Sequence, residues 1–373
     1  MKTRTTQKAS LIRWIALGVI LSGSLLLNYL HATGGVTYPS VHAICPYGGV
    51  ENLWAWLTSR GNIQKIFSGT MVLFFLTTIF AVIFGRSFCG NICPFGALQE
   101  LIGMPFSRSK VPGRIDRVLR LVKYGILALS AVMAWVTLTL WLSPFDPWAA
   151  LAHVYNIEEM LLEYGLGAVI LILTLLASLF ISRFFCKYLC PAGALYALIS
   201  KISPLKIVRD PKKCIGCAAC TKACLMDIEV HKVEKVKTGE CITCMRCVDV
   251  CPAPGSMIAA RAGKRIIKPL LAVVLSIAVF FGSILLLDMA GLYMVALPSQ
   301  QEILEKGITI RVDDLRGSMT IEMGALYTGK SLEEFYSLME IPASVPKDTQ
   351  LKSVGDYVAG YDFHAVKARK ISG

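Results

Sequence analysis

The chain has 373 residues, of which 55% are hydrophobic and only 17% charged, and its mean hydropathy is +0.59. Soluble globular domains carry about 25% charged residues, so the composition excludes an ordinary water-soluble protein. The formal charge of +13 is dispersed among apolar segments and lacks an interleaved aromatic stacking surface. We therefore expect no nucleic acid among the partners.

Five apolar stretches have a length suited to crossing a bilayer. They cover residues 11–30, 63–84, 121–142, 164–182 and 269–289. The first could be a signal peptide, because Lys2, Arg4 and Lys8 precede it. Its apolar run is long and no clear cleavage site follows, so we favour an uncleaved anchor. The sequence predicts an α-helical integral membrane protein with about five transmembrane helices.

Basic residues predict the orientation of these helices. Segments 1–13, 85–123 and 183–268 together hold 27 Lys or Arg, whereas segments 31–65 and 143–163 hold two. Basic loops stay in the cytoplasm. We expect a multi-pass protein of the cell (inner) membrane, with its N-terminus inside and its last eighty or so residues outside.

Two cysteine runs have the spacing that binds two [4Fe–4S] clusters, with the fourth Cys of each run serving the other cluster. The expected ligands of cluster 1 are Cys214, Cys217, Cys220 and Cys251. Those of cluster 2 are Cys241, Cys244, Cys247 and Cys224. Zinc rarely needs two overlapping four-cysteine runs, and disulfides rarely follow this spacing. Leu225 stands where a proline usually follows the fourth Cys, which affects the turn and not the ligands.

A second cysteine pattern occurs twice, each time with an Arg shortly before it. The copies are Arg86–Pro94 and Arg183–Pro191, and both read Arg-x2-Cys-x3-Cys-Pro. We expect the two thiols of each copy to share one helix face and the Pro to open the next helix. Four thiols could close a third iron–sulfur or metal site at the membrane edge: Cys89, Cys93, Cys186 and Cys190. Thiol–disulfide cycling and simple packing remain alternatives.

Several polar side chains are expected near the outer membrane surface. Carboxylate and imidazole groups there suit proton release from a quinol, and the candidates are His42, Glu51, Asp146 and His153. Each is equally at home as an interfacial polar residue. The tryptophans fit an outer aromatic belt: Trp54, Trp56, Trp135, Trp141 and Trp148. Cys45, also outside, is expected to be buried, paired to another chain, or reactive, and the histidine positions disfavour a b-type haem.

The twin Cys-x3-Cys-Pro motifs, followed by the two-cluster module, resemble the membrane polyferredoxins of the NapH, NosR and RdxA type over residues 10–265. The first external loop, His42–Glu51, is similar as well. The resemblance implies the electron-transfer (quinol dehydrogenase-like) subunit of an oxidoreductase complex. It also implies three partners, which are membrane lipid, quinone or quinol, and a reductase or dehydrogenase. A redox-sensing or metalloenzyme-assembly ferredoxin is the alternative.

The expected domains follow from these patterns. They are a four-span membrane domain (1–204), a cytoplasmic ferredoxin-like α+β domain with both [4Fe–4S] clusters (205–265), a fifth transmembrane helix (266–293) and an extracytoplasmic tail (294–373). The fifth span and the tail depart from the NapH pattern. Ser331-x2-Glu334 has the spacing of a capping box, so we expect the tail to be a small, mainly helical docking module.

Overall fold

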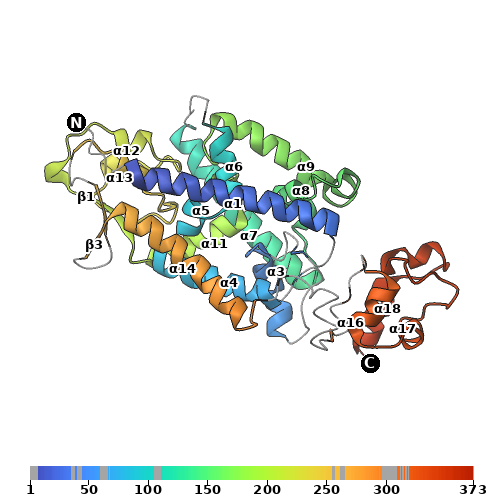
Figure 1. Ribbon diagram of the computed structural model, residues 1–373. Helices are drawn as coiled ribbons and strands as arrows, with labels where there is room; N and C mark the ends of the chain where they lie inside the picture. The colour runs from blue at the N-terminus through green and yellow to red at the C-terminus, as the bar shows by residue number, and fades with distance from the viewer. Residues whose placement is uncertain are drawn as a thin grey trace.

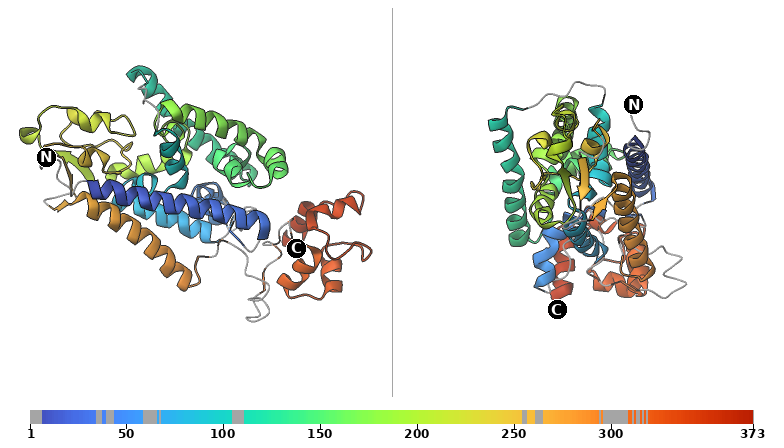
Figure 2. Two further views of the ribbon diagram at one scale, coloured as in Figure 1. Left: turned by 45° about the horizontal axis from the view of Figure 1, so that its top comes forward. Right: turned by 90° about the vertical axis from the view of Figure 1, so that its left-hand side faces the viewer.

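The computed structural model describes residues 7–34, 38–39, 44–58, 66, 68–104, 111–253, 257–260, 265–293, 295, 309–310, 312, 315, 317 and 319–372. These residues are mainly helical (Figure 1). A small module with the only strands of the described chain lies at one end of the long helices. The C-terminal helices lie at the other end (Figures 1 and 2).

In the described part of the chain, four helices are long and apolar enough to cross a membrane. They are α1 (Gln7–Gly34), α7 (Gly113–Thr137), α9 (Ile157–Phe180) and α14 (Pro269–Met289). The second expected span is the shorter helix α4 (Ser68–Phe84) of 17 residues. At 1.5 Å per residue it is about 25 Å long, less than the roughly 30 Å of a hydrocarbon core. A total of five crossings therefore remains a prediction.

Three of the candidate spanning helices differ from their expected ranges, and α1 extends past 11–30 at both ends. Helix α7 begins at Gly113, before the expected start at residue 121. Its first turns are polar, so they fall outside the apolar stretch, but they are helical. It stops at Thr137 because Leu138 has a φ of 54°, a left-handed conformation that ends helices. Helix α9 begins at Ile157 and is kinked at Tyr164. The range of α14 matches the expected 269–289.

The described chain contains the same sequence of helices twice. In the first copy, α3 (Gly48–Leu57) and α4 precede α5 (Ser87–Asn91) and α6 (Pro94–Ile102). In the second, η2 (Ser143–Phe145), α8 (Pro147–Ala152) and α9 precede α10 (Phe184–Tyr188) and α11 (Pro191–Ile199). Each copy thus ends in a long apolar helix, a five-residue helix and a helix opened by proline. The copies pack together, because α11 of the second copy contacts α4 of the first, and α6 of the first contacts α9 of the second.

The strand-containing module carries both cysteine runs. Strands β1 (Lys206–Arg209), β2 (Met257–Ala260) and β3 (Ile266–Ile267) form an antiparallel sheet in that order, with Val208 opposite Ile258. The remaining elements are short: η3 (Ser200–Ile202), η4 (Pro211–Lys213), α12 (Ala219–Lys222), η5 (Val230–Lys232) and α13 (Arg246–Asp249). Helices α12 and α13 contact each other, so the two cysteine runs meet face to face.

The C-terminal helices have a hydrophobic core of their own. They are α16 (Ile321–Thr328), α17 (Leu332–Leu338), η7 (Leu351–Asp356) and α18 (Phe363–Ser372), packed around buried residues such as Phe335 and Leu351. The capping box is confirmed, because Ser331 and Glu334 each accept a hydrogen bond from the other's backbone N–H. The domain boundaries and a docking role for the tail remain predictions.

Candidate functional site

The two cysteine loops have the same unusual backbone. The residues two positions after the first Cys, Gly216 and Thr243, have φ values of 72° and 52°. The residues directly after the second Cys, Ala218 and Met245, have φ values of 54° and 59°. Non-glycine residues in this left-handed region cost about 1–2 kcal/mol each and tend to mark functional sites. Successive left-handed turns also point backbone N–H groups at an anion.

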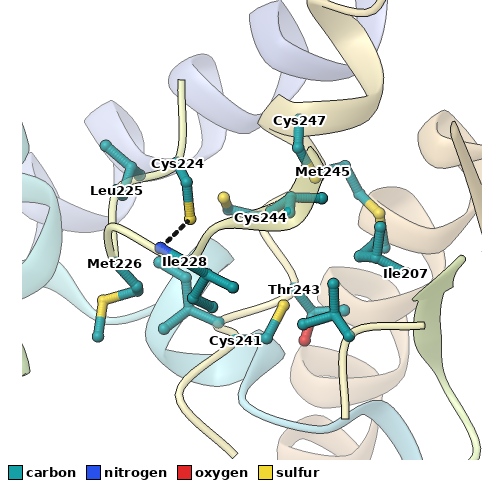
Figure 3. A pocket seen from close by; sticks show the side chains of 13 residues that line it. Ile207, Cys224, Leu225, Met226, Ile228, Cys241, Thr243, Cys244, Met245 and Cys247 are labelled. Atoms are coloured by element: carbon teal, nitrogen blue, oxygen red, sulfur yellow. Dashed lines mark hydrogen bonds between the residues drawn. The ribbon is translucent and has the colours of Figure 1, made fainter. Parts of the chain in front are cut away.

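Each predicted ligand set lines one cavity. Cys224, Cys241, Cys244 and Cys247 surround the first (Figure 3), and Cys214, Cys217, Cys220 and Cys251 line the second. In the described chain, no three His, Cys, Asp or Glu side chains converge closely enough to hold a single metal ion. Burial raises the pKa of the Cys241 thiol to about 12, so binding a cluster there would displace a proton. The donor set therefore fits [4Fe–4S] clusters, and the individual ligands remain predictions.

The two cavities differ in their access to solvent. Cys217 is exposed at the mouth of the cluster-1 cavity, whereas none of the cluster-2 cysteines is exposed. The cluster-1 cavity also includes His231, whose Nδ1 lies 2.8 Å from the Thr221 hydroxyl. The cavity predicted for cluster 1 is thus the outer one and that predicted for cluster 2 the inner one.

The Cys-x3-Cys pairs do not lie on single helix faces, so that prediction was wrong. Cys89 belongs to α5, but Cys93 has a ψ of 116° and is the N-cap of α6. Cys190 is likewise the N-cap of α11. A residue before proline avoids the helical region, which breaks the helix between the two thiols. Pro94 and Pro191 do open the next helices, as predicted.

The arginine of each copy crosses to the other copy. A Cβ on Gly96 would lie 2.7 Å from the Arg183 guanidinium, and one on Gly193 would lie 2.9 Å from that of Arg86. Arg183 donates to the Cys89 carbonyl. A side chain at either glycine would force the facing guanidinium to move.

A second observation concerns the charge that the four-cysteine group (Cys89, Cys93, Cys186 and Cys190) could hold. Arg86 is 1% exposed, and its Nε and Nη2 atoms have no hydrogen-bond partner. The Gly193 N–H donates to the Cys190 sulfur at 3.2 Å, and Gln99 donates to the Cys186 sulfur at 3.3 Å. Buried donors without acceptors are costly. Thiolates carrying a cluster would give the two Arg86 donors acceptors, so the group fits an iron–sulfur centre.

Charged residues next to the cluster-2 cysteines bind this module to the membrane helices. Glu240, which precedes Cys241, accepts from Arg86 at 3.1 Å and from Tyr124 at 3.0 Å, and it also pairs with Lys123. Asp227, in the segment after Cys224, pairs with the buried Lys187 of α10. The attachment is therefore concentrated around cluster 2.

Glu100 of α6 makes the most buried of these links. Its side chain is 1% exposed and bonds Arg13 at 2.6 Å, Arg183 at 3.0 Å and Arg246 at 2.9 Å. Burial alone would raise the pKa of Glu100, but the guanidinium groups of Arg183 and Arg13 lower it to about 2. Arg246 lies between Cys244 and Cys247, so one carboxylate joins α1, the second Cys-x3-Cys copy and the cluster-2 loop.

A large apolar cavity adjoins the four-cysteine group. Its volume is about 480 Å³, and its walls include Cys93, Cys186 and Cys190 together with Cys45 and Asp146. Aromatic side chains contribute much of the rest, among them Phe95, Trp141, Phe145, Trp148 and Phe185. The buried Trp148 therefore faces this cavity, and an outer-belt position is wrong for it.

The four predicted quinone residues are distributed unevenly. Asp146 lines the cavity and caps α8 by accepting from the Trp148 N–H. Glu51 is buried, accepts from the Leu142 N–H at 3.0 Å and does not line it. His153 is not in the lining either, because its ring stacks on Tyr164 with centroids 4.4 Å apart. His42 lies outside the described residues.

Sequence reasoning missed the residues that join the two redox sites. Glu100 and Glu240 each bond partners more than eighty positions away, which no local pattern reveals. The sequence does contain one signal. Gly96 and Gly193 each lie three positions after the second Cys of their copy, just as each Arg lies three positions before the first Cys. A glycine matched in both copies suggests a close approach.

Comparisons with known proteins agree with this arrangement. The family described as "4Fe-4S binding domain" matches residues 68–112 and again 165–209, and "4Fe-4S dicluster domain" matches residues 206–252. No solved structure matches the chain significantly.

The named relatives include a putative electron transport protein, YccM, and several ferredoxin-type proteins. YccM from Escherichia coli (strain K12) is 30% identical over 68% of this chain and 74% of its own length. The ferredoxin-type protein NapH from Haemophilus influenzae is 30% identical over 47% of this chain and 63% of NapH. The regulatory protein NosR from Pseudomonas aeruginosa is 27% identical over 50% of this chain and 27% of NosR. This chain therefore belongs to the family of iron–sulfur, ferredoxin-type membrane electron-transport proteins that includes NapH and NosR.

Proposed function

We propose that this protein conducts electrons between the membrane quinone pool and a partner redox protein. Clusters 1 and 2 would be held by the eight cysteines of the strand-containing module, and a third centre by the four-cysteine group. Bound iron–sulfur clusters supply one-electron carriers. The protein's own residues would hold the clusters in order, exclude water from them and accept the protons that leave a quinol.

The position of the four-cysteine group carries this proposal. On one side, Cys93, Cys186 and Cys190 line the apolar cavity. On the other, Cys89 shares a hydrophobic cluster with Ile242 and Cys244 of the cluster-2 loop. The group thus lies between room for an apolar ligand and the inner cluster. This supports an electron path that runs from the cavity to the four-cysteine group, then to cluster 2 and finally to cluster 1.

The cavity suits a flat, apolar ligand with a few polar atoms. Its volume of about 480 Å³ lies within the range of about 300–1,000 Å³ typical of ligand pockets. Ile20 of α1 and Ile284 of α14 belong to its wall, and both helices are candidate membrane spans. A lipid-soluble quinone could therefore reach the cavity from the bilayer at the wall that these helices form.

Asp146 and Glu51 are the proposed proton acceptors. Oxidation of a quinol releases two electrons and two protons. Burial raises the pKa of Asp146 to about 6, and burial together with the Asp146 charge raises the pKa of Glu51 to about 7. Groups with such pKa values exchange protons readily near neutral pH. Asp146 would take one of the two protons at its carboxylate oxygen, and Glu51 would take the other.

Stopped-flow reduction of the full-length protein in lipid nanodiscs tests this function. Menaquinol should reduce the clusters, as followed by absorbance and low-temperature EPR. The variant Ala192→Phe, which fills the cavity next to Cys190, should slow this reaction at least about tenfold while dithionite still reduces the clusters. Clusters that stay oxidised under menaquinol, yet respond to dithionite, would contradict the quinone role and favour a redox-sensing or assembly protein.

We also propose that the N-terminus and the strand-containing module are cytoplasmic and that residues 294–373 are extracytoplasmic. The excess of Lys and Arg in the segments at that end of the helices supports this orientation. Labelling of single cysteines placed at Lys212 and Lys352 with a membrane-impermeant maleimide in intact cells tests it. Only the second position should react.

A further inference from the structure

We propose that the exposed face around cluster 1 docks a small acidic protein that carries one electron. The proposal rests on the proposed function, because it names the partner at the outer end of the electron path. It concerns the surface formed by Lys212, Lys213, Ile215, Cys217 and Lys222, called here the cluster-1 face.

The centre of the cluster-1 face is apolar and directly beside predicted cluster ligands. Ile215, between Cys214 and Cys217, is 67% exposed. Gly216 has a φ of 72°, and a Cβ there would meet no atom within 4 Å. Ile215 lines the cluster-1 cavity, yet most of its surface is open to solvent beside a left-handed turn. A partner protein could therefore approach Gly216, which directly precedes the exposed Cys217.

Three lysines lie within seven positions of this apolar centre in the sequence. Lys212, Lys213 and Lys222 are all exposed. Within the described residues, no carboxylate lies within 4.0 Å of Lys212 or Lys222, and Lys213 has only a 3.8 Å contact with the partly exposed Asp210. Residues 206–237 hold eight Lys or Arg against four Asp or Glu, and Asp227 is already neutralised by Lys187. The cluster-1 face therefore carries uncompensated positive charge.

The charged residues near cluster 2 differ from the lysines near cluster 1 in having partners outside the module. Three charged residues in the cluster-2 segments, Asp227, Glu240 and Arg246, are each paired with residues outside the module. The three lysines near cluster 1 are exposed to solvent instead. The positive charge near cluster 1 is thus left largely without a partner among the described residues. At the end of the molecule away from α16–α18 (Figures 1 and 2), the cluster-1 face is open to a soluble protein.

An acidic partner follows from electrostatic complementarity. A positive rim around an apolar centre speeds association with a negative protein by about 10- to 1,000-fold at low ionic strength. Transient redox complexes are small and depend on such steering more than on buried area. A ferredoxin or flavodoxin with a negative surface has the required chemistry, and a basic carrier does not.

The experiment uses the full-length protein in nanodiscs of zwitterionic lipid. Its clusters, reduced beforehand, are mixed with an oxidised small acidic two-[4Fe–4S] ferredoxin, and the second-order rate constant is measured against salt. The test variant is Lys212→Glu/Lys213→Glu/Lys222→Glu. The control is Lys201→Glu/Lys235→Glu/Lys237→Glu, an equal charge change at exposed lysines outside the cluster-1 face. Basic cytochrome c serves as the contrasting carrier.

We expect the wild-type rate with the acidic ferredoxin to fall as salt rises. The test variant should be at least about tenfold slower at low salt and insensitive to salt, whereas the control variant should change by less than about threefold. Ile215→Ser should slow exchange without changing the salt dependence. A test variant with the wild-type rate, or cytochrome c reacting as fast as ferredoxin with the same salt dependence, overturns the proposal.

Two further outcomes separate the alternatives. If the test variant differs from wild type only in nanodiscs with anionic lipid, the lysines serve lipid headgroups and the proposal fails. If menaquinol does not reduce the wild-type clusters but ferredoxin exchange keeps its dependence on the cluster-1 face, the docking surface stands and the quinone function fails.

Discussion

Gly90 lies directly against Ile242, so that a Cβ added to Gly90 would stand 2.1 Å from the Ile242 carbonyl oxygen. Gly90 follows Cys89 in the first Cys-x3-Cys copy, and Ile242 follows Cys241 in the cluster-2 loop. Two backbones that carry ligands of different predicted centres therefore touch with no side chain between them. In the second copy, the same position is Lys187, which reaches Asp227 instead.

Replacing Gly90 by Ala should force these backbones apart. We expect a loss of about 1–3 kcal/mol in unfolding free energy, as for other overpacked sites, together with slower reduction of cluster 2 by menaquinol. Chemical denaturation and stopped-flow spectroscopy measure the two effects. Gly125→Ala on α7 is the matched control, because a Cβ there meets nothing within 4 Å. Equal behaviour of the two variants would show that the contact is unimportant.

The Glu100→Gln substitution should be strongly destabilising. It keeps the shape of the side chain but leaves three buried or partly buried guanidinium groups without their carboxylate. Breaking a buried ion pair in this way costs about 3–5 kcal/mol. Denaturation of detergent-purified protein measures the change. Glu322→Gln, which removes an exposed pair with Lys347, should have little effect. A Glu100→Gln variant as stable as wild type would exclude a structural role for this network.

The same carboxylate predicts a pH dependence. The pKa of Glu100 is lowered in the folded protein from 4.5 to about 2, so its ionised form favours folding. Its contribution is fully present above about pH 4.5 and is lost as the pH falls toward 2. The stability difference between wild type and Glu100→Gln should therefore narrow below about pH 4.5. Thermal unfolding at a series of pH values checks this, and a constant difference down to pH 3 would contradict it.

The four-cysteine group predicts a definite iron content. If it holds a [4Fe–4S] cluster, the purified protein should contain about twelve iron atoms per chain, whereas two clusters alone give about eight. Cys89→Ser combined with Cys186→Ser should lower the content by about four and block reduction by menaquinol. Cys45→Ser should leave the iron content unchanged. If menaquinol still reduces the clusters of the double variant at the wild-type rate, the third centre is excluded.

Much of the local structure could be predicted from the sequence, because it depends on neighbours in the chain. The range of α14 and the helix starts at Pro94 and Pro191 follow from apolar runs and from the missing N–H of proline. The capping box at Ser331 has the same local origin. The break between Cys89 and Cys93 has a local cause too, because a residue before proline avoids the helical region.

The links between distant segments could not be predicted in this way. Arg246 and Glu100 are 146 positions apart, and only the fold decides which of many charged residues meet. The cavity also depends on several helices at once, so Asp146 lines it while Glu51 and His153 do not. From the sequence alone, each of these three residues was an equally good candidate for accepting a proton from quinol.

The separate core of the C-terminal helices affects how this protein unfolds. The buried cluster around Phe335 and Leu351 draws its members from residues 315–366, whereas the clusters of the membrane helices and the cysteine loops end at Phe280. Two such cores form separate cooperative units. Calorimetry on the whole chain should therefore resolve two unfolding transitions, each with its own melting temperature. A single transition would show that the two cores unfold together.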